Sequence, residues 1–105
     1  MYVKVYEYHI QKEKVAEYFR IQEKATNIYK KYIDSETTYL QSHDDPTKWM
    51  EITTYTSEEE YQKNIAVINE NVEIQLLFSE FHSLLLPENK HIKEEDFTKV
   101  RGRTR

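Results

Sequence analysis

The chain has 105 residues, of which 38% are hydrophobic and 32% are charged, and this balance is typical of one globular domain rather than of a disordered segment. It contains no cysteine, which excludes disulfides, thiolate catalysis and cysteine-based metal centres. Its formal net charge of −4 argues against general nucleic-acid binding, because such binding depends on a basic surface.

The start of the chain lacks the basic region and apolar run of a signal peptide, and no apolar stretch approaches the roughly 20 residues of a membrane span. We therefore expect a cytoplasmic protein with no membrane association. We also expect a single domain over residues 1–105, whose arginine-rich end, residues 101–105, is a frayed and solvated terminus.

The first half of the chain predicts a strand, a helix and a hairpin. Residues 2–10 alternate and are rich in β-branched and aromatic side chains, which favours a strand. Residues 13–33 carry apolar side chains on one broad helical stripe, which favours a helix with one buried face. Residues 37–43 and 48–56 predict two more strands, and the turn between them contains Pro46.

The second half predicts a broken helix and an edge strand. Ser57 and Glu60 have the spacing of a capping box, which marks a helix start. The apolar stripe then shifts, so we predict a break between Asn69 and Val72, with Pro87 ending the second segment. Residues 97–100 predict a short edge strand among lysines, which discourage edge-to-edge aggregation.

The order β-α-β-β-α-β is that of an α+β, ferredoxin-like fold, in which helices cover one face of an antiparallel sheet. The apolar helix positions predict the core. The residues expected there are Phe19, Tyr29, Ile65, Ile68, Leu77, Phe81 and Leu84.

Alternation sorts the strand residues into two sets that occupy opposite faces of the sheet. The aliphatic set is predicted to face the helices. The other set is too aromatic to leave in water and too polar for a dry core. We therefore predict a homodimer through this second face, which encloses a lumen able to hold a small molecule. The aliphatic set is Val3, Val5, Leu40, Met50 and Ile52, and the aromatic set includes Tyr39, Trp49, Glu51 and Tyr55.

A family resemblance rests on Asp45-Pro46 with Trp49 three residues on, on segment 55–61 and on a broken helix that ends with segment 78–87. With the order of elements over residues 2–87, these features resemble the antibiotic-biosynthesis-monooxygenase-like group of dimeric α+β barrels. The group includes cofactor-free quinone-forming oxygenases, haem-degrading enzymes and many proteins of unknown role.

The resemblance does not extend to the haem-degrading pattern. Those members carry an Asn on the first strand, a Trp in the lumen and a His on the second long helix. Trp49 could supply the Trp, but the first strand has no Asn and His82 lies far along its helix. The resemblance therefore implies a barrel without a cofactor.

In an antiparallel sheet of this order, His9, His43 and Trp49 meet at one end, beside Asp44 and Asp45. A neutral histidine there could act as a general base towards a phenolic or enolic substrate. Two histidines at strand ends could equally be solvated, or join an aspartate in a metal site, although no metal motif is present.

Glu51 is the third candidate catalytic residue, because burial in a lumen would raise its pKa. Trp49, Tyr39, Tyr55 and Glu7 are the candidate substrate contacts. The aromatic members of this set could also be packing residues of the dimer interface.

Three functions follow from these predictions. The first is a cofactor-free, monooxygenase-like oxidoreductase or an isomerase that acts on a small aromatic or polyketide-like compound. The second is a non-catalytic binding or stress-associated barrel with the same lumen. The third is a structural dimer whose lumen is filled by its own side chains, since a fold does not determine a function.

Overall fold

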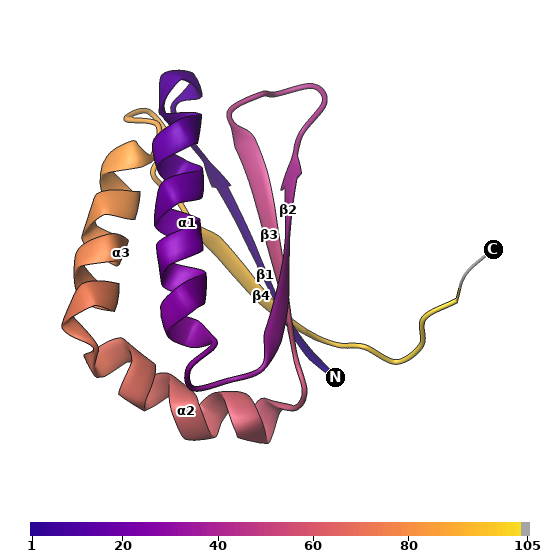
Figure 1. Ribbon diagram of the computed structural model, residues 1–105. Helices are drawn as coiled ribbons and strands as arrows, with labels where there is room; N and C mark the ends of the chain where they lie inside the picture. The colour runs from indigo at the N-terminus through magenta and orange to yellow at the C-terminus, as the bar shows by residue number, and fades with distance from the viewer. Residues whose placement is uncertain (104–105) are drawn as a thin grey trace.

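A four-stranded antiparallel sheet is covered on one side by helices in the computed structural model, which describes residues 1–103 (Figure 1). The strands lie in the order β2-β3-β1-β4, which is the ferredoxin-like arrangement predicted from the sequence. Thr104 and Arg105, the end of the predicted frayed tail, lie outside the described residues. The elements are β1 Tyr2–His9, a 3₁₀ helix Lys12–Lys14, α1 Val15–Tyr29, β2 Ser35–Gln41, β3 Lys48–Tyr55, α2 Glu58–Glu70, α3 Val72–Leu84 and β4 Lys93–Thr98.

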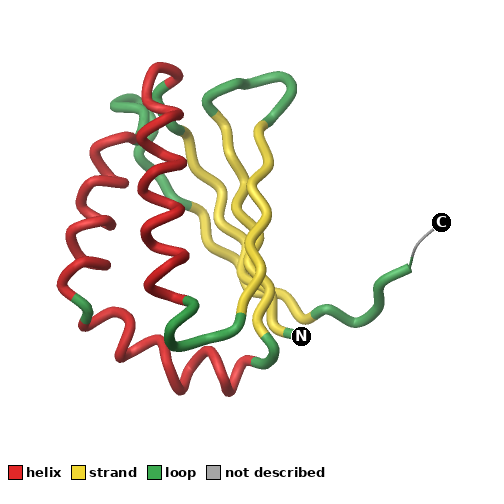
Figure 2. Tube along the Cα trace, in the orientation of Figure 1, coloured by secondary structure: helices red, strands yellow, loops and turns green. Residues whose placement is uncertain are grey.

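The helices form one layer against the sheet. α1 and α3 run side by side over it, and α2 crosses the end at which β2 begins (Figure 2). Ser57 caps α2, since its Oγ accepts a hydrogen bond of 3.1 Å from the backbone N–H of Glu60. The predicted break between α2 and α3 is confirmed at Asn71. Its backbone is extended, and its Oδ1 accepts a hydrogen bond of 3.0 Å from the N–H of Ile74 to cap α3.

The two faces of the sheet are the reverse of the sequence prediction. Tyr8 pairs with Trp49 and Tyr6 with Glu51, and this aromatic set points at the helices. Val5 pairs with Ile52 on the opposite face, which no helix covers. The prediction that the aliphatic set faces the helices, and that the aromatic set faces a partner, was therefore wrong.

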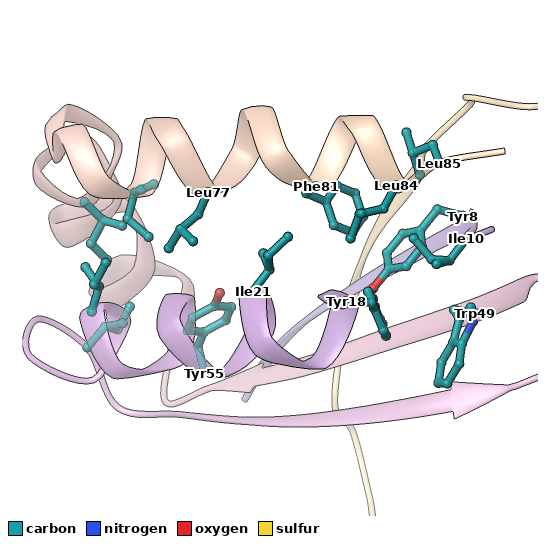
Figure 3. Packing of buried hydrophobic residues seen from close by; sticks show 14 of the residues in the cluster. Tyr8, Ile10, Tyr18, Ile21, Trp49, Tyr55, Leu77, Phe81, Leu84 and Leu85 are labelled. Carbon is teal, nitrogen blue, oxygen red and sulfur yellow. Dashed lines mark hydrogen bonds between the residues drawn. The ribbon is translucent and has the colours of Figure 1, made fainter. Parts of the chain in front are cut away.

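The physical reason for the reversal lies in the helices, which present aromatic rings of their own. The ring of Phe81 on α3 lies 4.9 Å from that of Tyr8, and the ring of Tyr18 on α1 lies 5.0 Å from that of Trp49 (Figure 3). The hydroxyls of Tyr8 and Tyr18 are 2.6 Å apart, so two buried polar groups satisfy each other. Aromatic strand residues can therefore be buried within one chain.

Most predicted helical core residues are confirmed. Ile68, Leu77, Phe81 and Leu84 are buried, and Tyr29 and Ile65 are partly buried and pack against the core.

Phe19 is the exception. It is 44% exposed, whereas its neighbour Tyr18 is fully buried. Successive helix residues point about 100° apart, so only one of the two can face the core. Tyr18 takes that position because its hydroxyl has a buried partner, while Phe19 packs on the outer side of Trp49 at 5.5 Å.

The fourth strand is an edge strand, as predicted, but it begins earlier, at Lys93, and ends at Thr98. It pairs antiparallel with β1, with Lys4 opposite Asp96 and Val3 opposite Phe97. All six of its residues are exposed, so its apolar content was a poor guide to its position.

Candidate functional site

A cavity of about 280 Å³ lies between the sheet and the helices of the same chain. Ile21 on α1 and Leu77 and Phe81 on α3 supply apolar wall. Thr26 and Ser35 also line it and are exposed, so the cavity reaches the surface near the end of α1. Its volume is just below the roughly 300 Å³ at which drug-sized pockets begin, which suits a small ligand. Six tyrosines contribute to the lining: Tyr6, Tyr8, Tyr29, Tyr39, Tyr55 and Tyr61.

A chain of hydrogen bonds converges on Glu51 in the wall of this cavity. The Tyr8 hydroxyl donates to Glu51 Oε1 at 2.7 Å, and Gln22 Nε2 donates to the same oxygen at 3.3 Å. Because the single proton of Tyr8 is used in this way, Tyr18 donates to Tyr8. The Tyr39 hydroxyl donates to Gln22 Oε1 at 3.2 Å and completes the chain. Strands β1, β2 and β3 and helix α1 therefore hold one carboxyl group in place.

Burial controls the protonation of this cluster. It raises the pKa of Glu51, and the hydrogen bonds from Tyr8 and Gln22 offset only part of that rise. Burial and the nearby charge of Glu51 raise the pKa of Tyr39 to about 12, and burial with the charge of Glu51 also raises the pKa of Tyr8 above its ordinary value. The tyrosines therefore stay neutral hydrogen-bond donors. Glu51, whose pKa is raised, is the group of this cluster that can exchange a proton with a bound molecule.

A second charged cluster, centred on Lys4, lies beyond the rim of the cavity. Lys4 is 5% exposed, and its Nζ donates to Asp96 Oδ1 at 2.9 Å and lies 3.7 Å from Glu94 Oε1. Burial by itself would lower the pKa of Lys4, but the hydrogen bond to Asp96 and the neighbouring acidic groups raise it instead. The Tyr2 hydroxyl also donates to Asp96, at 2.8 Å. The charge of Lys4 is therefore already compensated by carboxylates of the same chain.

Three of the site residues predicted from the sequence lie at the cavity, and a fourth lies next to it. Glu51, Tyr39 and Tyr55 line the cavity. Trp49 is buried beside it against Tyr18 and Phe19, and its Nε1 has no hydrogen-bond partner among residues 1–103.

The remaining predicted site residues lie elsewhere. His9 is at the end of β1, where its Nδ1 is 3.0 Å from Thr47 Oγ1 and 3.5 Å from Asp45 Oδ2. His43 is exposed in the turn after β2. Glu7 faces the uncovered side of the sheet and lies 3.6 Å from Lys48 Nζ. The structure brings His9 and Asp45 together, as the strand order predicted, but it does not bring either histidine to Glu51.

Tyr8, Tyr18 and Gln22 belong to the site and were missed. Tyr8 carried a signal, because it shares its alternation set with Tyr6 and pairs with Trp49. Gln22 carried a weaker one, as a polar residue beside Ile21 on the buried side of α1. Neither signal identified the residues as partners of Glu51, since that depends on how α1 sits on the sheet.

No group of three or more histidines, aspartates and glutamates among residues 1–103 has a geometry that could hold a metal ion. In the same residues, no helix combines the length and the apolar character needed to cross a bilayer.

No protein-family model matches this chain, and no curated protein matches it either. Solved structures of the same fold do match. An uncharacterized NIPSNAP domain protein from Burkholderia xenovorans has 14% sequence identity, a TM-score of 0.75 and 100% coverage of both chains. SnoaB, a cofactor-independent oxygenase from Streptomyces nogalater, has 12% identity and a TM-score of 0.72, with 96% of this chain and 94% of that chain covered. An antibiotic biosynthesis monooxygenase has 8% identity and a TM-score of 0.69, with 96% and 100% covered. At these identities the likeness is one of fold.

Proposed function

Since this chain has the fold of the antibiotic-biosynthesis-monooxygenase-like α+β proteins, we propose that it binds a small, largely apolar aromatic molecule between its own sheet and helices. The cavity around Glu51 is the observation that supports this proposal most strongly. Apolar side chains from α1 and α3 supply contact area, and the hydrogen-bonded carboxyl group supplies one fixed polar contact. A ligand with an aromatic ring and one polar group would match the apolar contact area and the polar contact.

Replacing either of two alanines on α1 by phenylalanine tests where the ligand binds. Ala25 lines the cavity and Ala16 is exposed on the same helix, so Ala25→Phe fills the cavity and Ala16→Phe does not. Hydroxylated aromatic compounds are titrated by calorimetry against both variants and the unmodified chain. We expect Ala25→Phe to weaken binding by at least about tenfold and Ala16→Phe to leave it unchanged. Equal binding by both variants would place the ligand outside this cavity.

Cofactor-independent oxygenation is a second proposal, supported by the raised pKa of Glu51 beside the cavity. As a carboxylate, Glu51 would accept a proton from an activated CH₂ group of a phenolic substrate. The resulting carbanion would reduce O₂, so that one oxygen atom forms the new carbonyl group and the other leaves as water. Tyr39 and Tyr55 would orient the substrate by hydrogen bonding.

Oxygen uptake with a panel of hydroxylated aromatic compounds tests this proposal. We expect Glu51→Gln to lower the rate by about a hundredfold or more, the usual contribution of a general base. His9→Ala and His43→Ala test the competing assignment of the base, and we expect both to keep most of the rate. If a histidine variant loses activity while Glu51→Gln keeps it, that histidine and not Glu51 is the base. An absence of uptake across the panel would leave a binding protein without catalysis.

We also propose that the protein is a homodimer through the uncovered face of the sheet. Here this face carries Val5, Ile52 and Met50 rather than the aromatic set. The exposed side chains of Leu40 and Phe97 extend the apolar area to both edge strands. Glu7, Lys93 and Glu95 lie among these apolar side chains, and a surface of mixed apolar and charged residues favours association.

A further inference from the structure

The cavity has an unusual charge content for a pocket that would hold a phenol or an acid. Among residues 1–103, its lining contains two carboxylates, Glu51 and Glu94, and no lysine, arginine or histidine. The remaining polar lining consists of neutral hydroxyl and amide groups. Such a lining offers no electrostatic compensation to a bound anion, and it offers two negative groups to a bound cation.

The two carboxylates are not equivalent. Glu94 is exposed to solvent and lies 3.7 Å from the Nζ of Lys4, whose charge it shares with Asp96. Glu51 forms no ion pair within residues 1–103, and both of its hydrogen bonds use Oε1. Its second oxygen, Oε2, is therefore the unused acceptor of a carboxyl group that faces the cavity.

Aromatic rings surround this carboxyl group. The Tyr8 hydroxyl donates to Glu51 Oε1 at 2.7 Å, and Tyr39 is linked to the same oxygen through Gln22. Tyr29 and Tyr55 line the same cavity as Glu51. Tyrosine rings carry negative potential on their faces, so rings beside a carboxylate form a suitable site for an organic cation.

Lys4 shows that the chain already stabilises a cation in this way. Its Nζ lies 5.1 Å from the ring centre of Tyr61, 5.7 Å from that of Tyr2 and 6.0 Å from that of Tyr6. Tyr6 and Tyr61 also line the cavity. One group of tyrosines and carboxylates is thus filled by a lysine of the chain, whereas the neighbouring group around Glu51 has no cation from residues 1–103.

We propose that the ligand of this cavity is a protonated aromatic amine, whose ammonium group binds Glu51 Oε2 while its ring lies against the apolar side chains of α1 and α3. This inference rests on the proposed ligand site and adds the charge of the ligand. The bound ammonium would stabilise the ionised form of Glu51, so that the cost of burying a carboxylate and the cost of burying an ammonium would offset each other. A neutral or anionic ligand provides no such compensation.

Three probes with the same ring and nearly the same length test the proposal on the unmodified protein. Tyramine is a cation, tyrosol is neutral and 4-hydroxyphenylacetate is an anion at pH 7.5. Calorimetric titration in about 0.15 M salt screens long-range attraction to the acidic surface. We expect tyramine to bind at least about tenfold more tightly than tyrosol, and 4-hydroxyphenylacetate to bind most weakly.

A pair of variants with the same change in net charge assigns the preference to one carboxyl group. Glu51→Gln should bring the ratio of tyramine to tyrosol affinity close to one. Glu73→Gln, in the exposed first turn of α3, should leave the ratio unchanged. Circular dichroism checks that both variants are folded, and the probe series on the unmodified chain remains decisive if Glu51→Gln does not fold.

The possible results separate this inference from the proposed function. If tyrosol or the acid binds as tightly as tyramine and Ala25→Phe abolishes that binding, the cavity is a ligand site but the preference for a cation is wrong. If none of the three probes binds at millimolar concentration, both proposals are overturned. If Glu73→Gln lowers the ratio as much as Glu51→Gln, the preference comes from the net charge of the surface and the inference fails.

Discussion

Glu51 is a carboxyl group that the sheet and helices enclose, and no cation among residues 1–103 pairs with it. Two hydrogen bonds to Oε1 fix its position, and burial raises its pKa. Below its ordinary pKa, the carboxyl group is protonated in both the folded and the unfolded chain. As the pH rises, the unfolded chain ionises first, which stabilises the unfolded state. The contribution of Glu51 to the free energy of unfolding is therefore largest in acid and declines as the pH rises through the raised value.

Glu51→Gln tests this linkage, since Gln keeps an oxygen that accepts from Tyr8 and Gln22 but does not titrate. We expect the melting temperature of the variant, relative to the unmodified chain, to increase as the pH rises above the ordinary pKa of glutamate, about 4.3. Thermal unfolding followed by circular dichroism at several pH values measures the difference. Glu73→Gln makes the same change in charge at an exposed position and is the control. A difference for Glu51→Gln that does not change with pH would contradict the raised pKa.

The sequence identified Glu51, Tyr39 and Tyr55 as members of a polar and aromatic set, because alternation along a strand reports which side chains share a face. It did not identify Gln22, whose role depends on how α1 is rotated against the sheet. It also favoured His9 and His43, whose residue type suggested chemistry although their strand-end positions lie away from the cavity. The position of a residue on the strand therefore predicted the lining of the cavity better than its chemical type did.

At the scale of the elements, β4 is attached to β1 by backbone pairing and by one charged side-chain contact. All six residues of the strand are exposed, so its attachment comes from backbone pairing with β1 and from Asp96, which accepts hydrogen bonds from Lys4 and Tyr2. These hydrogen bonds lower the pKa of Asp96. A sequence method that looks for apolar alternation therefore has little to detect in this strand.

Removing Asp96 from its contact with Lys4 should lower the free energy of unfolding more than removing Lys4 does. Asp96→Ala leaves a buried ammonium beside Glu94, the Tyr2 hydroxyl and the rings of Tyr6 and Tyr61, and we expect it to lower the free energy of unfolding by about 1–2 kcal/mol. Lys4→Met keeps the length of the side chain and leaves Asp96 to water, so we expect a loss below about 1 kcal/mol. Urea unfolding measures both values.

Glu95→Ala serves as the control for these two variants. It changes the same strand on the opposite face, and should be close to neutral. If Lys4→Met proved more damaging than Asp96→Ala, then the lysine would contribute more through its tyrosine contacts than through the charge that Asp96 compensates.

The start of α2 was predictable from its capping box, and the break before α3 from the shift of the apolar stripe, because both signals are local. Ser57 and Asn71 each accept a hydrogen bond from a backbone N–H three residues further on, so a short stretch of sequence contains the whole interaction. The start of β4 was not predictable in the same way. Its register is determined by β1, which is more than eighty residues earlier in the chain.

At the scale of the whole molecule, the order of elements established the fold class but not which face of the sheet carries the helices. Both alternation sets are amphipathic, so neither could be assigned to the core by hydrophobicity alone. Tyr18 and Phe81 determine which face is buried, since their rings pack against the aromatic set and the Tyr18 hydroxyl forms a hydrogen bond with Tyr8. This complementarity between α1, α3 and the sheet is a property of the packed structure.

The proposed dimer is tested by placing a charge at the centre of the uncovered face. Ile52→Glu would bury an unpaired carboxylate in the interface at a cost of several kcal/mol, so we expect the variant to be monomeric. At about 10 μM, light scattering should give twice the chain mass of 12.8 kDa for the unmodified protein. The variant should give the mass of a single chain. Val67→Glu, on the exposed side of α2, is the control and should remain a dimer. A monomer of the unmodified chain at this concentration would contradict the proposal.

The position of the cavity has a consequence for stoichiometry. The sheet separates the cavity from the uncovered face, and every residue that lines the cavity comes from one chain. A dimer through that face would therefore hold two complete and separate sites instead of one shared chamber. Such an assembly should bind one molecule per chain with a simple hyperbolic isotherm, and dilution that dissociates the pair should leave the affinity of each half unchanged.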